Sequence, residues 1–150
     1  MKKDVFLQII GNKIDRSGQN EQCELIAGGV YSYDTESNQY TIEYDETELS
    51  GMVGTKTKII AGRSKVQLVR DGGFQSHFVL EKGKKFIGNY TTPYGAIALE
   101  IMPTDIDCSL SEHGGNLSFR YSLLLAGENT DNIMSIKVYG EGDSLSGLMH

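Results

Sequence analysis

The stretch that decides the fold is "QYTIEYDE", residues Gln39 to Glu46. Aromatic or aliphatic side chains stand at positions 40, 42 and 44, and polar or acidic ones stand at positions 41, 43 and 45. A repeat of two sends successive side chains to opposite faces of a β-strand, whereas a helix repeats about every 3.6 residues. One face of this strand is therefore buried and the other faces water, which is typical of an antiparallel sheet.

The same alternation recurs along the chain. It is clear in "FQSHFVLE" (74–81), "GAIALEI" (95–101) and "NLSFRYSLLLA" (116–126), and runs rich in Gly, Asn, Asp and Ser separate these stretches. No window carries a sustained helical stripe. We predict about ten strands, near residues 4–14, 22–34, 39–47, 52–61, 64–71, 74–81, 85–91, 94–102 and 105–111, followed by a long final hairpin near 117–126 and 132–140.

The chain has only two prolines, and both border the strand predicted near 94–102. Thr92 is held extended by the proline that follows it. Pro93 suits the first central position of a tight turn, and Gly95 suits the last. We predict that this turn joins two strands. We also predict that Pro103, which has no backbone N–H to donate, ends the second of them.

Antiparallel strands in sequence order, each apolar on one face, form either a sandwich or a sheet closed on itself. Short connections without long crossovers favour an up-and-down meander. We therefore predict an all-β fold, a closed antiparallel barrel of about 8–10 strands. We expect one domain spanning residues 1–150, with a frayed tail at about 141–150. A barrel of this size encloses side chains or one small ligand.

The composition argues against several classes of partner and cellular location. The net charge of −6 and the pI of about 5.0 argue against nucleic acid and against an anionic membrane surface as partners. The apolar run in "MKKDVFLQIIG" is too short for a signal peptide, and no stretch is long enough to span a membrane. Cys23 and Cys108 lie far apart and form no CxxC motif, so we expect two buried free thiols in a reducing compartment and hence a cytoplasmic protein. The histidines are isolated, and we expect neither a metal site nor a cofactor.

Five motifs follow one another in a familiar order: "GGVYSYD", "YTIEYDETELSG", "VQLVRDGG", "NYTTPYG" and "LSFRYSLLLAG". Through them the chain resembles the YwiB-like family of small uncharacterised bacterial β-barrel proteins, described as calycin-like, over roughly Val5 to Tyr139. The most specific pieces are "YDETEL" (44–49) and "YTTPYG" (90–95). The resemblance implies a closed, lipocalin-like barrel and a bacterial origin, and it implies no activity. True lipocalins carry a Gly-x-Trp near the first strand. This chain has no Trp, which argues against lipocalin-style carriage outside the cell.

Strand parity places several polar side chains on the apolar face. Glu46 continues the apolar face of 39–46, and Arg70 continues that of "KVQLVRD" (65–71). The threonines of "VGTKTKII" (53–60) share a face with Val53. If this face lines the lumen, the candidate ligand-binding residues are Arg70, Glu46, Tyr44, Thr55, Thr57, Tyr90 and Tyr121.

Charges inside a barrel must be paired or solvated. One interpretation is that Arg70 anchors the carboxylate or phosphate of a ligand, with tyrosine hydroxyls as secondary donors. The other is an internal pair between Glu46 and Arg70, or a position at the rim where each charge reaches water. Parity alone leaves both open.

Three function hypotheses follow. The first is a small-molecule binding barrel with an apolar lumen and a polar anchor. The alternative is a protein–protein interaction or homodimeric assembly module with a filled core, for which the aromatic residues Tyr31, Tyr33 and Tyr94 could supply an outer surface. The lesser alternative is a barrel enzyme with Glu46 as general base and Arg70 as electrostatic stabiliser.

Overall fold

The computed structural model describes residues 2–46 and 52–140. The predicted tail at 141–150 and the last three residues of the "YDETEL" motif lie outside these ranges. The described chain forms ten strands: β1 (Lys2–Ile14), β2 (Asn20–Asp34), β3 (Gln39–Asp45), β4 (Thr55–Ala61), β5 (Lys65–Gly72), β6 (Ser76–Glu81), β7 (Phe86–Thr92), β8 (Gly95–Ser111), β9 (Gly114–Leu125) and β10 (Glu128–Tyr139).

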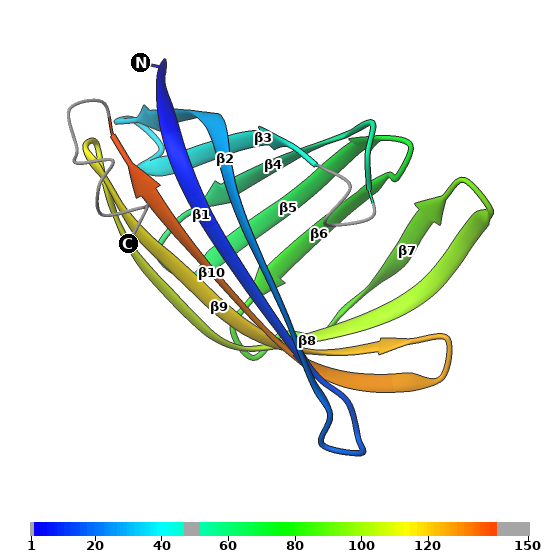
Figure 1. Cartoon of the computed structure of the whole chain (residues 1–150). Helices are drawn as coiled ribbons and strands as arrows, with labels where there is room; N and C mark the ends of the chain where they lie inside the picture. The colour runs from blue at the N-terminus through cyan, green and yellow to red at the C-terminus, as the bar shows by residue number, and fades with distance from the viewer. Residues whose placement is uncertain (1, 47–51, 141–150) are drawn as a thin grey trace.

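The ten strands make one antiparallel sheet in the order β6-β5-β4-β3-β2-β1-β10-β9-β8-β7. Every pair of neighbours except β1 and β10 is also consecutive in the chain, and the pairing of these two curls the meander into a nearly closed barrel (Figure 1). The prediction of an all-β antiparallel barrel is confirmed. The described part of the chain contains no helix long and apolar enough to cross a membrane.

The sheet ends at β6 and β7, which face each other across a seam (Figure 1). An isolated bridge joins Gln75 to Thr91 at one end of the seam, through two backbone hydrogen bonds of 2.9 Å each. At the other end, in the turn between the two strands, the backbone N–H of Lys84 donates a hydrogen bond to the carbonyl of Glu81 (3.0 Å). On the inside, the ring of Phe78 lies 5.9 Å from that of Phe86 and 6.2 Å from that of Tyr90. Aromatic packing therefore covers the seam where backbone pairing stops.

The core is the inner face of the sheet, and the period-two pattern explains it. In β4 the buried residues alternate strictly with exposed or half-buried ones, and β5 and β6 follow the same rule. Val53 is an exception to the prediction, because it lies in the turn before β4 and is 60% exposed. The largest fully buried side chains include Leu7, Ile42, Ile59, Leu80, Ile101, Leu117, Phe119 and Ile136.

The prediction that Pro103 ends a strand is wrong. A single strand, β8, runs from Gly95 to Ser111, and the register shifts between Pro103 and Asp105. Thr104 is the extra residue of this bulge, and its hydroxyl donates to the carbonyl of Arg120 (3.3 Å). A bulge absorbs the missing N–H of proline without ending the strand, and it reverses which positions point inward.

The turn predicted at 92–95 is present and joins β7 to β8. The hydroxyl of Thr92 accepts from the backbone N–H of Tyr94 and donates to the carbonyl of Gly95, both at 3.0 Å. Gly95 has a φ of +129°, a conformation that other residues rarely adopt. The proline and the glycine therefore fix a corner at the rim of the barrel.

Candidate functional site

A polar row crosses the inner face of four neighbouring strands. Tyr44 of β3 is opposite Thr57 of β4, Thr57 is opposite Arg70 of β5, and Arg70 is opposite Ser76 of β6. Directly paired residues in a sheet point to the same side. The register therefore brings these four side chains together, although they are up to 32 residues apart in the sequence.

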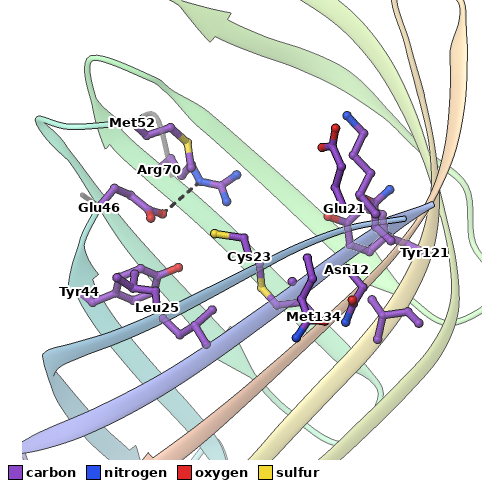
Figure 2. Close-up of a pocket in the computed structure, with 16 residues that line it drawn as sticks. Asn12, Glu21, Cys23, Leu25, Tyr44, Glu46, Met52, Arg70, Tyr121 and Met134 are labelled. Atoms are coloured by element: carbon purple, nitrogen blue, oxygen red, sulfur yellow. Dashed lines mark ion pairs between the residues drawn. The ribbon is translucent and has the colours of Figure 1, made fainter. Parts of the chain in front are cut away.

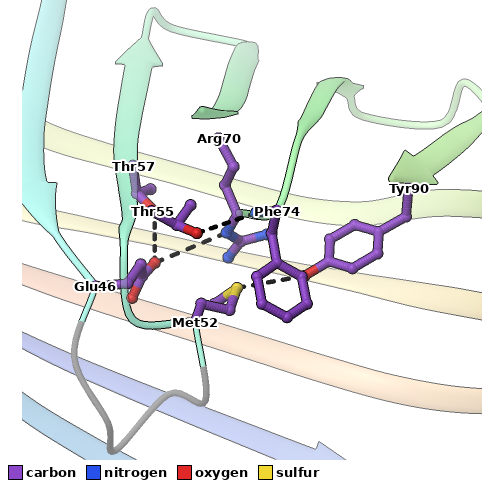
Figure 3. Close-up of polar contacts among 7 residues, drawn as sticks. All are labelled: Glu46, Met52, Thr55, Thr57, Arg70, Phe74 and Tyr90. Atoms are coloured by element: carbon purple, nitrogen blue, oxygen red, sulfur yellow. Dashed lines mark hydrogen bonds and ion pairs between the residues drawn. The ribbon is translucent and has the colours of Figure 1, made fainter. Parts of the chain in front are cut away.

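Glu46 lies at one end of this row, directly after β3 (Figure 3). Its Oε2 accepts a hydrogen bond from the Thr57 hydroxyl and lies 3.7 Å from Nε of Arg70. The side chains of Glu46 and Arg70 are 3% and 11% exposed. The internal ion pair, one of the two predicted interpretations, is therefore formed, and it keeps two buried charges compensated.

The guanidinium of Arg70 keeps donor capacity despite this pair. Nε is buried and makes no hydrogen bond within the described part of the chain, since 3.7 Å exceeds hydrogen-bond distance. A guanidinium carries five N–H donors in a planar fork. The ion pair supplies charge compensation, but it leaves the fork with donors for another acceptor.

Burial raises the pKa of the lumen tyrosines. Burial is the main cause for Tyr44, and the neighbouring Glu46 carboxylate raises its pKa further. Burial also raises the pKa of Tyr90 and Tyr121, while the positive charge of Arg70 acts in the opposite direction at both. These hydroxyls are neutral donors at physiological pH, within reach of the electrostatic field of Arg70.

Two predicted residues are already engaged in structural contacts (Figure 3). The hydroxyl of Thr55 accepts a hydrogen bond from the backbone N–H of Phe74 (3.1 Å), which ties the β4 end to the segment before β6. The hydroxyl of Tyr90 donates to Sδ of Met52 (3.3 Å). Thr55 is therefore part of the wall, whereas Tyr90 and Met52 together cover one side of the cavity described next.

The inner side of the barrel contains two adjacent hollows that are partly open to solvent. One, of about 390 Å³, is lined mainly by aliphatic and aromatic side chains, and we call it the apolar cavity. The other, of about 440 Å³, is lined by apolar side chains such as Ile9, Leu25 and Met134 together with Glu46 and polar residues of β1 and β2, and for these polar groups we call it the polar cavity (Figure 2). Five residues line both cavities and so mark the junction between them: Lys13, Met52, Arg70, Tyr121 and Asn132.

A second polar row reaches the junction from the other wall. Tyr121 of β9 is opposite Asn132 of β10, Asn132 is opposite Lys13 of β1, and Lys13 is opposite Glu21 of β2. The amide of Asn132 donates to the hydroxyl of Thr130 (3.0 Å). Lys13 lines both cavities, as Arg70 does, but it is exposed, and the exposed Glu21 is its partner on β2.

All seven predicted site residues lie on the inner wall, and their role in binding stays a prediction. Sequence reasoning missed Ser76, Lys13, Glu21 and Asn132. For Ser76, strand parity could have predicted the inward position, because Ser76 lies between Phe74 and Phe78 on one face of "FQSHFVLE". No local signal predicts that Lys13 and Arg70 line the same cavities, since this depends on how the sheet curls.

The outer surface carries fewer candidates. The prediction that both thiols are buried is wrong for Cys23, which is exposed, and Cys108 is half-buried. His77 is exposed, and its ring contacts Oε1 of Gln67 (2.9 Å). Within residues 2–46 and 52–140, no group of three or more His, Cys, Asp or Glu side chains could hold a metal ion. Of the tyrosines proposed for an outer surface, Tyr31 is buried and donates to the carbonyl of Ser111 (2.6 Å), whereas Tyr94 is 98% exposed.

Comparisons with known proteins agree with this architecture. The family described as Domain of unknown function (DUF1934) matches residues 7–136. The uncharacterized beta-barrel protein YwiB of Bacillus subtilis (strain 168) is 26% identical over 143 residues, which cover 95% of this chain and 97% of that protein. The crystal structure of the Bacillus subtilis protein superposes with a TM-score of 0.77 at 20% identity, over 91% of this chain and 92% of that one. The predicted resemblance to the YwiB-like family is confirmed, and the structural match shows the same fold.

Proposed function

We propose that this chain, which belongs to the DUF1934 family, a domain of unknown function, binds one small, largely apolar molecule carrying a polar or anionic group. The proposal comes from the geometry of the lumen. The apolar body of the ligand occupies the apolar cavity. The polar group lies at the junction, within reach of Arg70. No cofactor takes part in this function.

The observation that carries the proposal is the meeting of an apolar cavity with a buried guanidinium. Small-molecule sites are concave and mostly apolar, with a few well-placed polar groups, and they have volumes of about 300–1,000 Å³. The apolar cavity, at about 390 Å³, falls in this range, and Arg70 lies at its border. A filled core would leave only voids near the size of a water molecule. Antiparallel barrels of this size, the calycin-like proteins among them, hold one small ligand in the same way.

Binding fits the polar groups better than catalysis does. A general base must reach the proton that it removes. The carboxylate of Glu46 is 3% exposed and already accepts from Thr57. Although Glu46 lines the polar cavity, its carboxylate is engaged by Thr57 and Arg70, so its role in this proposal is to hold Arg70 in place. We also propose a cytoplasmic location, since two cysteines on separate strands do not form a disulfide framework.

To test this proposal, a larger side chain is introduced into the apolar cavity so that no ligand can enter it. Leu123 lines the apolar cavity, and its neighbour Leu124 points to the opposite side of β9. Native mass spectrometry of the protein with fatty-acid and phosphorylated-metabolite libraries should show a 1:1 complex. Leu123→Trp should abolish this complex, whereas Leu124→Trp should keep it. Thermal unfolding of both variants checks that they fold, because overpacking costs about 1–3 kcal/mol. Equal binding by Leu123→Trp and the wild type would refute the proposal.

A second candidate function, assembly through the outer face, is supported by two exposed apolar residues. Phe6 and Ile26 are 44% and 51% exposed, and the register of β1 and β2 makes them diagonal neighbours. Such a pair is a small patch, whereas stable interfaces bury about 800 Å² per partner. Sedimentation velocity decides: a dimer lost in Phe6→Ser supports assembly, and a monomer at all concentrations excludes it.

A further inference from the structure

We infer that the lumen ligand is a short-chain monocarboxylate whose head group lies at the junction between Arg70 and Tyr121, with its tail in the apolar cavity. This inference rests on the proposed function and names the class of its ligand. It follows from which groups line the junction, how they are charged, and what lies on either side.

The junction is built by opposed walls. Arg70 comes from β5, whereas Tyr121, Asn132 and Lys13 come from β9, β10 and β1. Figure 2 shows Arg70 and Tyr121 projecting from different sides of the polar cavity. All four residues line both cavities, so any molecule that extends from one cavity into the other passes between them.

The chemistry of the junction selects an acceptor. The guanidinium of Arg70 carries only donors, and the hydroxyl of Tyr121 is a neutral donor whose pKa is raised further by burial. Lys13, which is exposed, adds a positive charge at the solvent side of the junction. Asn132 uses its amide N–H on Thr130. The guanidinium fork matches the two oxygens of a carboxylate, and a hydroxyl that donates to a charged acceptor makes a stronger bond than it makes to a neutral one. An alcohol or an amine supplies no such charge.

Glu46 limits the ligand to a single negative charge. Its carboxylate lies 3.7 Å from Arg70 and is held there by Thr57. A bound anion therefore lies close to a fixed negative charge in a buried site. A phosphate monoester carries about −1.5 to −2 charges at neutral pH, so its repulsion from Glu46 exceeds that of a carboxylate. The junction tolerates one negative charge and disfavours two.

The apolar cavity sets the size of the tail. Its wall includes Leu68, Phe78, Leu80, Leu99 and Leu125, which offer no hydrogen bonds from their side chains. At about 390 Å³ the cavity lies near the lower end of ligand pockets, which favours a short aliphatic or aromatic tail over a long lipid. Octanoate is therefore a suitable probe.

The experiment compares three probes that share one tail: octanoate, octan-1-ol and octyl phosphate. Isothermal titration should show octanoate binding at least about 10-fold more tightly than either of the others, as expected for a charge-assisted hydrogen bond. Tyr121→Phe removes only the hydroxyl and should weaken octanoate about 10-fold while leaving octan-1-ol unchanged. It keeps the Arg70–Glu46 pair intact.

A second variant tests the guanidinium itself. Arg70→Met combined with Glu46→Gln removes both charges and leaves no buried charge unpaired. It should weaken octanoate about 10- to 100-fold. The control is Arg63→Met, which removes one positive charge from the exposed turn between β4 and β5 and should leave octanoate affinity unchanged.

The outcomes separate this inference from the proposed function. Octan-1-ol binding as tightly as octanoate overturns the inference, because the head group is then not recognised, while lumen binding stands. Tighter binding of octyl phosphate overturns it as well. If none of the three binds, and an apolar fluorescent dye gives the same signal with wild type and with Leu123→Trp, both the inference and the proposed function fail.

Discussion

Single side chains in the lumen carry energetic costs that can be measured. Arg70 Nε and Ser76 Oγ are buried and have no hydrogen-bond partner in the described chain, and the two residues are paired across β5 and β6. A buried polar group without a partner costs about 1–3 kcal/mol. The inner wall is therefore less stable at this point than an apolar wall would be.

Replacing Ser76 should stabilise the protein. Ser76→Ala removes the unpartnered hydroxyl, and we expect the free energy of unfolding to rise by about 1 kcal/mol. Urea denaturation measures this change. Ser109→Ala, the same substitution at an exposed position, should change stability by less than about 0.5 kcal/mol. A loss of stability in Ser76→Ala would show that its hydroxyl has a partner in solution.

The buried tyrosines predict loss of stability at alkaline pH. Burial raises the pKa values of Tyr31 and Tyr44 well above the ordinary 10.0. Both side chains stay protonated in the folded state while the unfolded chain loses its protons. The stabilisation is therefore complete below about pH 10 and falls as the pH rises beyond it, by at most about 1.4 kcal/mol per pH unit for each residue.

The measurement is urea unfolding at several pH values on both sides of pH 10. Tyr44→Phe should have a shallower fall above pH 10 than the wild type, because it has lost one titrating group. Identical slopes in the two proteins would contradict a raised pKa for Tyr44.

At the scale of the strands, one glycine of β2 allows the close packing of β2 against its neighbours. Gly29 of β2 packs against β1 and β3: a β-carbon there would lie 2.6 Å from the carbonyl oxygen of Glu43 and 2.7 Å from Cδ1 of Leu7. At the adjacent Gly28 a β-carbon would meet nothing within 4 Å. Only one glycine of the pair is therefore required for packing.

This contrast gives a matched test. Gly29→Ala should lower the free energy of unfolding by about 1–3 kcal/mol, because a carbonyl oxygen of the sheet cannot move away cheaply. Gly28→Ala should be neutral or slightly stabilising, since it restricts the unfolded chain. Chemical denaturation of both variants measures the difference, and equal stabilities would contradict the packing of β2 described above.

At the scale of the whole molecule, the barrel has one weak line. Along β1 both edges are paired, to β2 and to β10, whereas β7 pairs fully only with β8. Backbone groups of β7 that face β6 depend on the Gln75–Thr91 bridge and on the aromatic cover. Opening of the native state is easiest where such pairing is sparse.

Hydrogen exchange followed by NMR tests this weak line. Amides of β1 and β10 should exchange last, at rates close to those of global unfolding. Amides of β7 that do not bond to β8 should exchange much faster, within the native state. Equal protection of β1 and β7 would show that the barrel is sealed in solution.

Strand parity predicted much of the candidate site. Glu46, Thr57 and Arg70 were placed inside the barrel from alternation alone, and they are inside. The same rule fails across Pro103, where the bulge moves the inward positions from odd to even residue numbers. Proline is compatible with both a strand end and a bulge. The neighbouring strand decides between the two, so no local pattern could.

By itself the sequence determined the strands, their inner faces and the order of the meander, because side-chain alternation and turn chemistry are local properties of the backbone. Only the tertiary structure decided that β1 pairs with β10, so that Lys13 and Tyr121 line the same cavities as Arg70. That convergence depends on register and curvature summed over ten strands. These arise from contacts between residues far apart in the chain, which no short stretch encodes.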